Sequence, residues 1–267
     1  MKHGSHMNGI GRQLILLYAT MMCAVSLYAQ EAPSAVRDHE NILSKKEKAT
    51  LEQVIAYQLA FYNRLFPDKP YNALTVGVLV IKNYAHFIAY QAEIGKTIYM
   101  HSPGFYSPLR KEIVVYKDAG GNKFLPICYH ELSHHILIER MPRPPSWLNE
   151  GLATYLENII ITSKGITAEP KPYYLSRVKT MIALKDLDLR DFITWDPRKF
   201  AETSFSHDSY GYALAHCMIH LLMKDEAAAF ALIRAIDGGK TPFEAFDLHY
   251  PGGFEQFEKD FLTIYTS

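Results

Sequence analysis

Apolar positions recur with two different periods along this chain, which predicts a mixed first half and a helical second half. From Asp38 to Phe66 apolar residues return every three or four positions, as in a long helix that buries one face. Ser44 and Glu47 match the S-x-x-E pattern of a capping box, and Pro67 and Pro70 follow the predicted end. The residues expected on the core side are Leu51, Val54, Ile55, Leu59, Tyr62 and Leu65.

Strands are predicted after this helix. Ala73 to Ile81 is a continuous apolar run, typical of a strand buried on both faces. A short helix is expected from Asn83 to Glu93. Further strands are expected at Lys96 to Met100 and Lys111 to Lys117, joined by the turn-rich stretch from His101 to Pro108.

Beyond Glu157 the pattern is almost entirely helical. Helical spacing of apolar residues covers Tyr173 to Leu184, Tyr210 to Lys224, Ala227 to Ile236 and Gly253 to Tyr265. The sequence therefore predicts an α+β fold, with a small mixed sheet and a mostly helical C-terminal half.

Composition is that of one globular domain, because 267 residues of which 48% are hydrophobic can bury a substantial core. The 28 basic and 28 acidic residues give a net charge of zero. No basic block indicates nucleic acid and no acidic tail indicates a solvating arm, so we expect no nucleic-acid partner.

The first 29 residues are expected to lie outside the folded domain. Met1 to His6, MKHGSH, resembles a cloning remnant, and Met7 is the expected native start. Arg12 and the apolar run from Leu14 to Leu27 then predict a signal peptide cut after Ala29.

This reading predicts an exported protein, periplasmic or secreted. The alternative is an uncleaved anchor, but the run is shorter than the roughly 20 residues that a bilayer span needs. Lipid attachment at Cys23 fits less well, because the residues before it match a lipobox badly. The predicted organisation is thus remnant and signal peptide at 1–29, linker at 30–43 and one domain at 44–267, with no membrane span after cleavage.

Candidate chemistry is concentrated between Ile127 and Glu157. His130 to His134 reads H-E-L-S-H, the HExxH pattern. On a helix, residues four apart lie about 40° apart around the axis, so His130 and His134 can bind one metal ion from the same face. Glu131 lies on the flank of that face, where a carboxylate can take a proton from an attacking water.

A second helix is predicted from Trp147 to Glu157, after the turn-rich Pro142 to Ser146. Proline cannot continue a helix, so the first helix must end near Arg140 or Met141 and the chain can double back. Glu150 then lies early in the return helix and can supply a third ligand, as in tetrahedral zinc sites with one open position.

These two segments resemble the gluzincin metallopeptidases, in particular the aminopeptidase N-like branch and the small peptidase MA-like domains of bacteria. The resemblance rests on HExxH followed by WLNEGLATYLE. It implies a zincin-like fold, a Zn²⁺ ion held by His130, His134 and Glu150, and Glu131 as general base. It also implies that an edge strand of the sheet pairs with an extended peptide along the cleft, and KEIVVY, from Lys111 to Tyr116, is the strand we expect there.

The resemblance covers roughly Leu43 to the end of the chain, with two departures. The connection between His134 and Glu150 is shorter than in the large aminopeptidases. No GxMEN segment, by which those enzymes hold a free amino terminus, occurs upstream. Endopeptidase action on a peptide or protein substrate is therefore expected rather than aminopeptidase action.

The family also has a tyrosine that donates to the transition state, at the start of a helix about sixty residues after the glutamate ligand. Tyr210 and Tyr212 both lie there. Aligning Tyr212 with the family tyrosine places the small Ala215 at a close-packing position, whereas aligning Tyr210 places His216 and His220 at apolar positions. Tyr212 is therefore preferred, with Tyr210 as the alternative.

Two function classes remain open. The first is an exported zinc peptidase. The second is a zinc-stabilised module that binds peptide or glycan without cutting it. Glu131 favours catalysis, because a binding module needs no general base.

Two further points remain open on the residues alone. Cys128 and Cys217 can form a disulfide after export or stay as buried thiols. Glu157, about two turns after Glu150, can either hold a ligand histidine or face solvent. The oligomeric state is not indicated.

Overall fold

The computed structural model describes residues 36–38, 41–70, 77–94, 103–107, 110–117, 124–162, 165–206 and 209–266. The predicted signal peptide and the predicted strand from Lys96 to Met100 lie outside these residues, as does the start of the predicted strand from Ala73.

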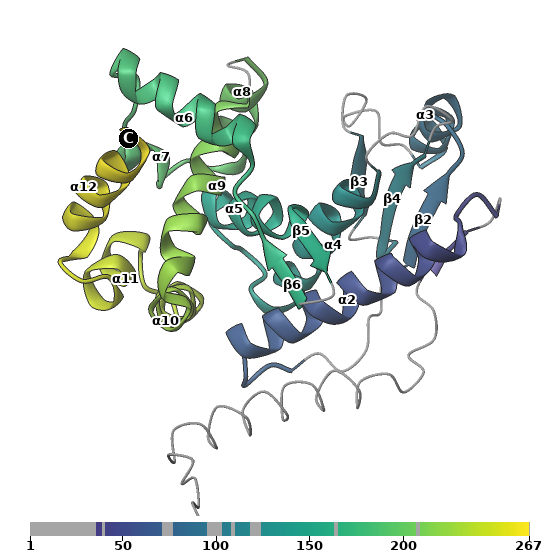
Figure 1. The fold of residues 1–267 in the computed structure, drawn as a ribbon, viewed down its shortest axis with the longest axis horizontal. Coiled ribbons are helices and arrows are strands. Elements are labelled where there is room, and N and C mark those ends of the chain that lie inside the picture. The colour runs from purple at the N-terminus through teal and green to yellow at the C-terminus, as the bar shows by residue number, and fades with distance from the viewer. Residues whose placement is uncertain are drawn as a thin grey trace, which may run out of the picture. The chain divides into compact units, whose positions relative to one another are not determined.

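A four-stranded mixed sheet forms the first part of the fold (Figure 1). Its strands, in spatial order, are β1 (Val36–Arg37), β2 (Gly77–Ile81), β4 (Glu112–Tyr116) and β3 (Gly104–Ser107). β2 pairs in parallel with β1 and β4, and β3 pairs antiparallel with β4. The described end of the apolar run from Ala73 is thus a buried interior strand, as expected.

Side chains of β2 alternate between two cores. Val78 and Val80 belong to the main core, which they share with α2 (Lys45–Leu65). Leu79 and Ile81 face the other way, into a smaller cluster covered by Phe87 of α3 (Tyr84–Glu93). The two-residue period of a strand thus places helices on both faces of the sheet.

The strand predicted to lie at the sheet edge lies inside the sheet. β4, the KEIVVY segment, has β2 on one side and β3 on the other. Among the described strands the edge next to β4 is β3, from the stretch predicted to be a turn. Flanking Gly and Pro indicated a turn, but short strands at sheet edges tolerate such neighbours.

Helix α2 begins later than predicted. The capping box of Ser44 and Glu47 is present, so the helix starts at Lys45 and not at Asp38. Asp38 instead accepts hydrogen bonds from the backbone N–H groups of Ile42 and Leu43, which fixes a turn before the helix. The predicted linker at 30–43 therefore contains a strand of the sheet, β1.

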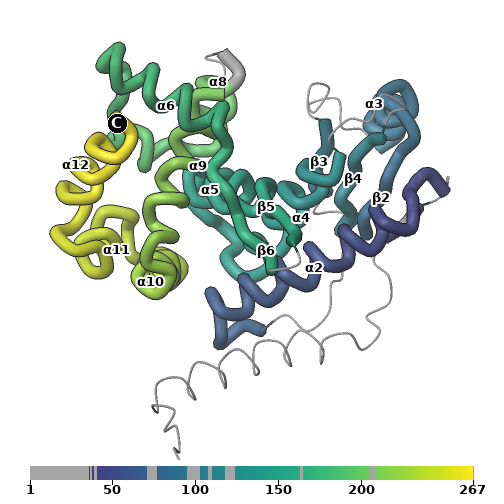
Figure 2. The backbone as a smooth tube through the Cα atoms, in the orientation of Figure 1, coloured from purple at the N-terminus to yellow at the C-terminus, as the bar shows by residue number. Residues whose placement is uncertain are grey.

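The second part of the fold is mainly helical (Figure 2). Its longer helices are α4 (Phe124–Arg140), α5 (Ser146–Glu157), α6 (Pro172–Leu184), α8 (Pro197–Ser206), α9 (Tyr210–Leu222), α10 (Glu226–Asp237), α11 (Pro242–His249) and α12 (Gly253–Thr266). A short helix, α7 (Leu189–Phe192), precedes α8, and the 3-10 turn η2 (Met223–Asp225) follows α9.

A β-hairpin interrupts this half, which the helical prediction missed. β5 (Ile159–Thr162) pairs antiparallel with β6 (Gly165–Ala168) directly after α5. The run of isoleucine and threonine favours a strand, because branched side chains fit a pleated surface better than a helix.

Helices α5 and α9 are in unusually close contact at Gly151. A Cβ atom there would lie 2.8 Å from the carbonyl oxygen of Ala215 and 2.6 Å from Ile219. The small residue expected on α9 at Ala215 does lie at this contact. Gly151 therefore allows α9 to approach α5 closely.

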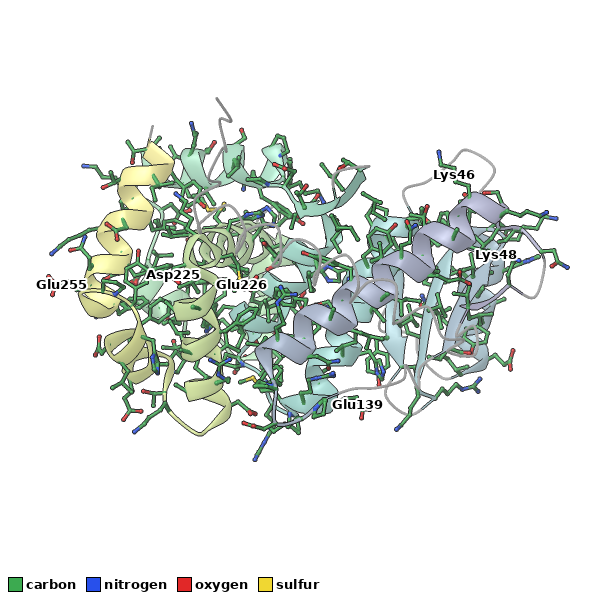
Figure 3. All side chains as sticks on the ribbon, turned by 60° about the horizontal axis from the view of Figure 1, so that its bottom comes forward. Lys46, Lys48, Glu139, Asp225, Glu226 and Glu255 are labelled. Atoms are coloured by element: carbon green, nitrogen blue, oxygen red, sulfur yellow. The ribbon has the colours of Figure 1, made fainter. Side chains whose placement is uncertain are left out.

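Charged side chains of both signs are spread over the surface, including Lys46, Lys48, Glu139, Asp225, Glu226 and Glu255 (Figure 3). Within the described residues, no helix combines the length and apolar character needed to cross a membrane. Cys128 and Cys217 are both buried and both free thiols.

Candidate metal centre

Helix α4 carries the HExxH residues and is held in place by its packing and by contacts with α2. Its apolar side is buried through Leu132, Ile136 and Leu137. Two contacts from α2 fix its rotation: the Gln58 amide donates to the Tyr129 carbonyl at 2.9 Å, and the Tyr62 and Ser133 hydroxyls are 2.6 Å apart. His130 and His134 therefore face away from the main core.

Helix α5 brings the third residue. It begins at Ser146, after the proline-rich turn that ends α4 at Arg140, and it packs against α4 and α9 (Figure 1). Trp147 and Leu148 are fully buried and anchor its first turn. Glu150 thereby faces the two histidines.

The three ligand atoms have the spacing of one face of a tetrahedron. The Nε2 atoms of His130 and His134 are 3.0 Å apart. Oε2 of Glu150 lies 3.4 Å from the first and 3.5 Å from the second. A tetrahedral ion with bonds of about 2.0–2.1 Å requires separations of about 3.3–3.4 Å between its ligands. This partly buried group can hold a metal ion.

Hydrogen bonding orients both rings toward the shared position. Nδ1 of His130 lies 3.2 Å from Oε2 of Glu157, and Nδ1 of His134 lies 3.0 Å from Oδ1 of Asn149. Neutral rings that donate from Nδ1 carry lone pairs on Nε2. Two such lone pairs then face each other beside a buried Glu150 oxygen that has no hydrogen-bond partner. A cation satisfies all three atoms, so the residues fit a metal ion.

The pKa shifts of His130, Glu150 and Glu157 reflect how close these charged groups lie to one another. Burial by itself lowers the pKa of His130, but the nearby carboxylates of Glu150 and Glu157 outweigh it and raise that pKa well above the ordinary value. Burial raises the pKa of Glu150, yet His134 and His130 hold it far below its usual range. Burial likewise raises the pKa of Glu157, but His130 and Lys171 outweigh it and lower that pKa to about 2. The carboxylates thus stay ionised around the two rings.

Glu131 is not one of the three converging residues, but its carboxyl lies near both histidines. Burial raises the pKa of its carboxyl, and the nearby His134 and His130 offset only part of that rise. The backbone N–H of Tyr106, on β3, donates to this carboxylate. The acidic group of the HExxH pattern therefore lies between the metal position and the edge strand.

The two tyrosines at the start of α9 have different surroundings. The ring of Tyr212 lies 6.4 Å from the ring of His130, and burial followed by the charges of Glu150 and Glu131 raises its pKa. Tyr210 instead donates to the Asp186 carbonyl at 2.7 Å and stacks on Trp195. Only Tyr212 of the pair borders the metal position.

Several residues at the centre were not predicted from the sequence. Asn149 contacts His134, and Lys171 contacts Glu157 at 2.8 Å. Tyr174 and His216 lie next to Lys171. Asn149 adjoins Glu150 in the sequence and could have been noticed, but no local pattern links Lys171 to Glu157, which lies 14 residues earlier in another element.

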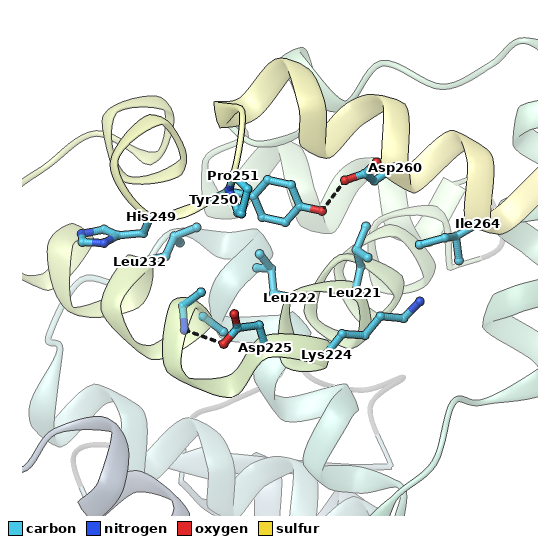
Figure 4. A pocket seen from close by; sticks show the side chains of 12 residues that line it. Leu221, Leu222, Lys224, Asp225, Leu232, His249, Tyr250, Pro251, Asp260 and Ile264 are labelled. Carbon is cyan, nitrogen blue, oxygen red and sulfur yellow. Dashed lines mark hydrogen bonds between the residues drawn. The ribbon is translucent and has the colours of Figure 1, made fainter.

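A separate cavity of about 300 Å³ lies between the end of α9 and helices α10 to α12 (Figure 4). Apolar side chains, among them Leu221, Leu222 and Leu232, form most of its wall. Asp225 accepts from the Ala228 N–H and caps α10, and the Tyr250 hydroxyl donates to Asp260 at 2.7 Å. These polar groups serve the local helices, and none of His130, His134 and Glu150 lines the cavity.

No model of a known protein family matches the chain, and no curated protein matches it. The fold and the site together define an α+β protein with a small mixed sheet, a mostly helical second half and a His-His-Glu group that can hold a metal ion.

Proposed function

We propose that this protein is an exported zinc-dependent peptidase that hydrolyses peptide bonds within peptides or proteins. The observation that carries the proposal is the tetrahedral spacing of the atoms of His130, His134 and Glu150, with Glu131 beside them. Two nitrogen ligands and one carboxylate with an open fourth position are typical of catalytic zinc. Export is inferred from the apolar run at Leu14 to Leu27.

Zinc bound here would supply a Lewis acid that polarises the peptide carbonyl and activates water. The carboxylate of Glu131 would accept a proton from the attacking water and deliver it to the leaving nitrogen. The raised pKa of Glu131 suits the first step, because a carboxylate with a higher pKa takes a proton from water more readily.

The Tyr212 hydroxyl would donate a hydrogen bond to the oxygen that gains charge as the carbonyl is attacked. Burial keeps this phenol protonated, because its pKa is raised. A donor that matters more as charge develops lowers the barrier without tightening the binding of substrate.

The substrate strand would lie along β3, and not along the KEIVVY strand β4. β3 is the described edge strand, and its Tyr106 already directs a backbone N–H at Glu131. Extended peptides bind to exposed strand edges through backbone hydrogen bonds, so a peptide paired here would present a carbonyl close to Glu131.

The proposal is tested by incubating the purified chain with an unbiased peptide pool, with and without a metal chelator, and by elemental analysis. We expect one zinc per chain, cleavage that stops with the chelator and returns with Zn²⁺, and neither zinc nor cleavage in His134→Ala. Bound zinc without cleavage of any peptide would leave the binding-module hypothesis instead.

A further inference from the structure

Glu157 bridges the metal centre and a lysine on a third element. Its Oε2 atom lies 3.2 Å from Nδ1 of His130, while its Oε1 atom lies 2.8 Å from Nζ of Lys171. The Glu157 side chain is only 15% exposed, so both of its oxygens depend on protein partners more than on water. The orientation of His130 is therefore linked to Lys171 through one carboxylate.

Lys171 is itself held at several points. It immediately precedes α6, which lies beside α9 (Figure 2). Its Nζ lies 4.8 Å from the ring centre of Tyr174, and its backbone N–H donates to Nε2 of His216 at 2.9 Å.

His216, on α9, holds the backbone of Lys171 in place through this hydrogen bond. The ring is fully buried, and burial followed by the effect of His220 lowers its pKa to about 3. It therefore stays neutral, with an Nε2 lone pair that accepts the Lys171 N–H. The lysine thus starts from a fixed backbone position.

We propose that Lys171 is a positioning residue of the metal centre, which holds Glu157 in the orientation that accepts the Nδ1 proton of His130. The inference rests on the proposed function, because it assigns this role toward a zinc ion bound by His130, His134 and Glu150. Partners that orient a ligand histidine typically change metal affinity 10- to 100-fold when they are removed, by order of magnitude.

A positioning role for Lys171 and a purely electrostatic role predict opposite changes in zinc affinity when Lys171 is replaced. A positive charge near a bound cation repels it, so a lysine that acted only through its charge would weaken zinc binding. A lysine that orients Glu157 strengthens zinc binding. The Lys171 side chain is 33% exposed and lies beyond Glu157 from His130, so solvent and the carboxylate both screen the repulsion.

The experiment measures Zn²⁺ affinity of the metal-free chain by competition with a chromophoric chelator, for wild type, Lys171→Met, Glu157→Gln and the double variant. We expect a loss of roughly tenfold in Lys171→Met and a loss of about 10- to 100-fold in Glu157→Gln. The double variant should match Glu157→Gln alone, because a residue that acts through Glu157 has nothing left to orient.

Lys199→Met is the matched control. Lys199 also pairs with a carboxylate at 2.8 Å, that of Asp191, and lies 5.0 Å from the ring centre of Trp195. The Lys199→Met variant loses the same kinds of contact at a place away from the candidate metal ligands. Its zinc affinity should therefore equal that of the wild type. Lys171→Arg, which keeps the charge and the hydrogen bond, should retain most of the affinity.

Circular dichroism of each metal-free variant checks folding, and Lys171→Gln is the second variant if Lys171→Met does not fold. Unchanged or tighter zinc binding in the folded lysine variant, or losses that add in the double variant, would overturn the inference alone. A wild-type chain that binds no zinc would overturn the proposed function itself, and the inference with it.

Discussion

At the level of single residues, a proton and a metal ion would compete for the candidate metal position. The raised pKa of His130 belongs to the metal-free protein, in which Glu150 and Glu157 stabilise an extra proton on that ring. In the proposed zinc site, the metal ion would replace this proton as the positive charge between His130, His134 and Glu150. The carboxylates that would attract the ion would therefore also make its binding depend on pH.

Zinc affinity should fall as the pH falls through the raised pKa of His130. An ordinary histidine, with a pKa of 6.5, is neutral above that value, but His130 stays protonated to higher pH. Below its raised pKa, zinc must displace a proton, so affinity should drop about tenfold per pH unit. Without metal, that proton stabilises the fold fully below pH 6.5, and its contribution is lost as pH rises through the raised pKa.

Chelator competition between about pH 6 and about pH 9 measures the first effect, and calorimetry in buffers of different ionisation enthalpy counts the protons released. Constant affinity across this range, with no proton release, would contradict the assigned ligand protonation.

Glu131→Gln should keep the metal and the fold but lose turnover by roughly 10²- to 10⁴-fold. The amide has nearly the same shape and cannot accept a proton from water. Zinc content and peptide cleavage, measured on the same preparation, test this separation. Equal cleavage rates in wild type and Glu131→Gln would remove the general-base role.

Tyr212→Phe should lower kcat by about 10²-fold with little change in KM, whereas Tyr210→Phe should leave both nearly unchanged. The two variants remove the same hydroxyl from neighbouring positions, one beside His130 and one bonded to the Asp186 carbonyl. Steady-state kinetics compare them. If Tyr210→Phe loses most of its activity while Tyr212→Phe stays fully active, Tyr210 is the hydrogen-bond donor instead.

At the level of elements, the centre depends on how closely α9 approaches α5. Gly151 and Ala215 remove the side chains that would otherwise separate the two helices. α9 carries both Tyr212, next to the metal position, and His216, next to Lys171. The distance between α5 and α9 therefore determines where both Tyr212 and His216 lie relative to the candidate metal centre.

Gly151→Ala should destabilise the protein by about 1–3 kcal/mol, because the new methyl group meets the backbone oxygen of Ala215, which cannot rotate away. The free energy of unfolding in urea measures this cost. The helices must separate to relieve the contact, so zinc affinity should fall as well. A variant with unchanged stability and unchanged affinity would show that the contact is looser than the structure indicates.

At the level of the whole molecule, the sheet edge and helices α4 and α5 together would determine how a substrate of the proposed peptidase lies. β3 runs next to α4, and its Tyr106 meets Glu131. A peptide bound along a strand edge extends past the metal position on both sides, and the chain carries no GxMEN segment.

Peptides blocked at both ends should therefore be cleaved internally, while unblocked aminoacyl amides should be poor substrates. Mass spectrometry of the products from paired blocked and free peptides measures the preference. Rapid release of single amino-terminal residues, with blocked peptides left intact, would reverse the prediction.

Local features of the sequence determined the elements that carry the candidate metal ligands. The helical period puts His130 and His134 one turn apart on one face, and the prolines after Met141 separate this helix from the next one, which carries Glu150. The capping box at Ser44 and the apolar run ending at Ile81 predicted α2 and β2 for the same reason. These features act over a few residues, where the chain itself fixes the geometry.

Only the tertiary structure decided what lies beside those elements. Whether β3 or β4 forms the edge depends on which strands pair, and two apolar segments with similar patterns do not reveal their order. The contact of Lys171 with Glu157 joins separate elements, and the different surroundings of Tyr210 and Tyr212 depend on packing against Asp186 and His130. Such contacts arise when distant segments pack together, so no local periodicity could encode them.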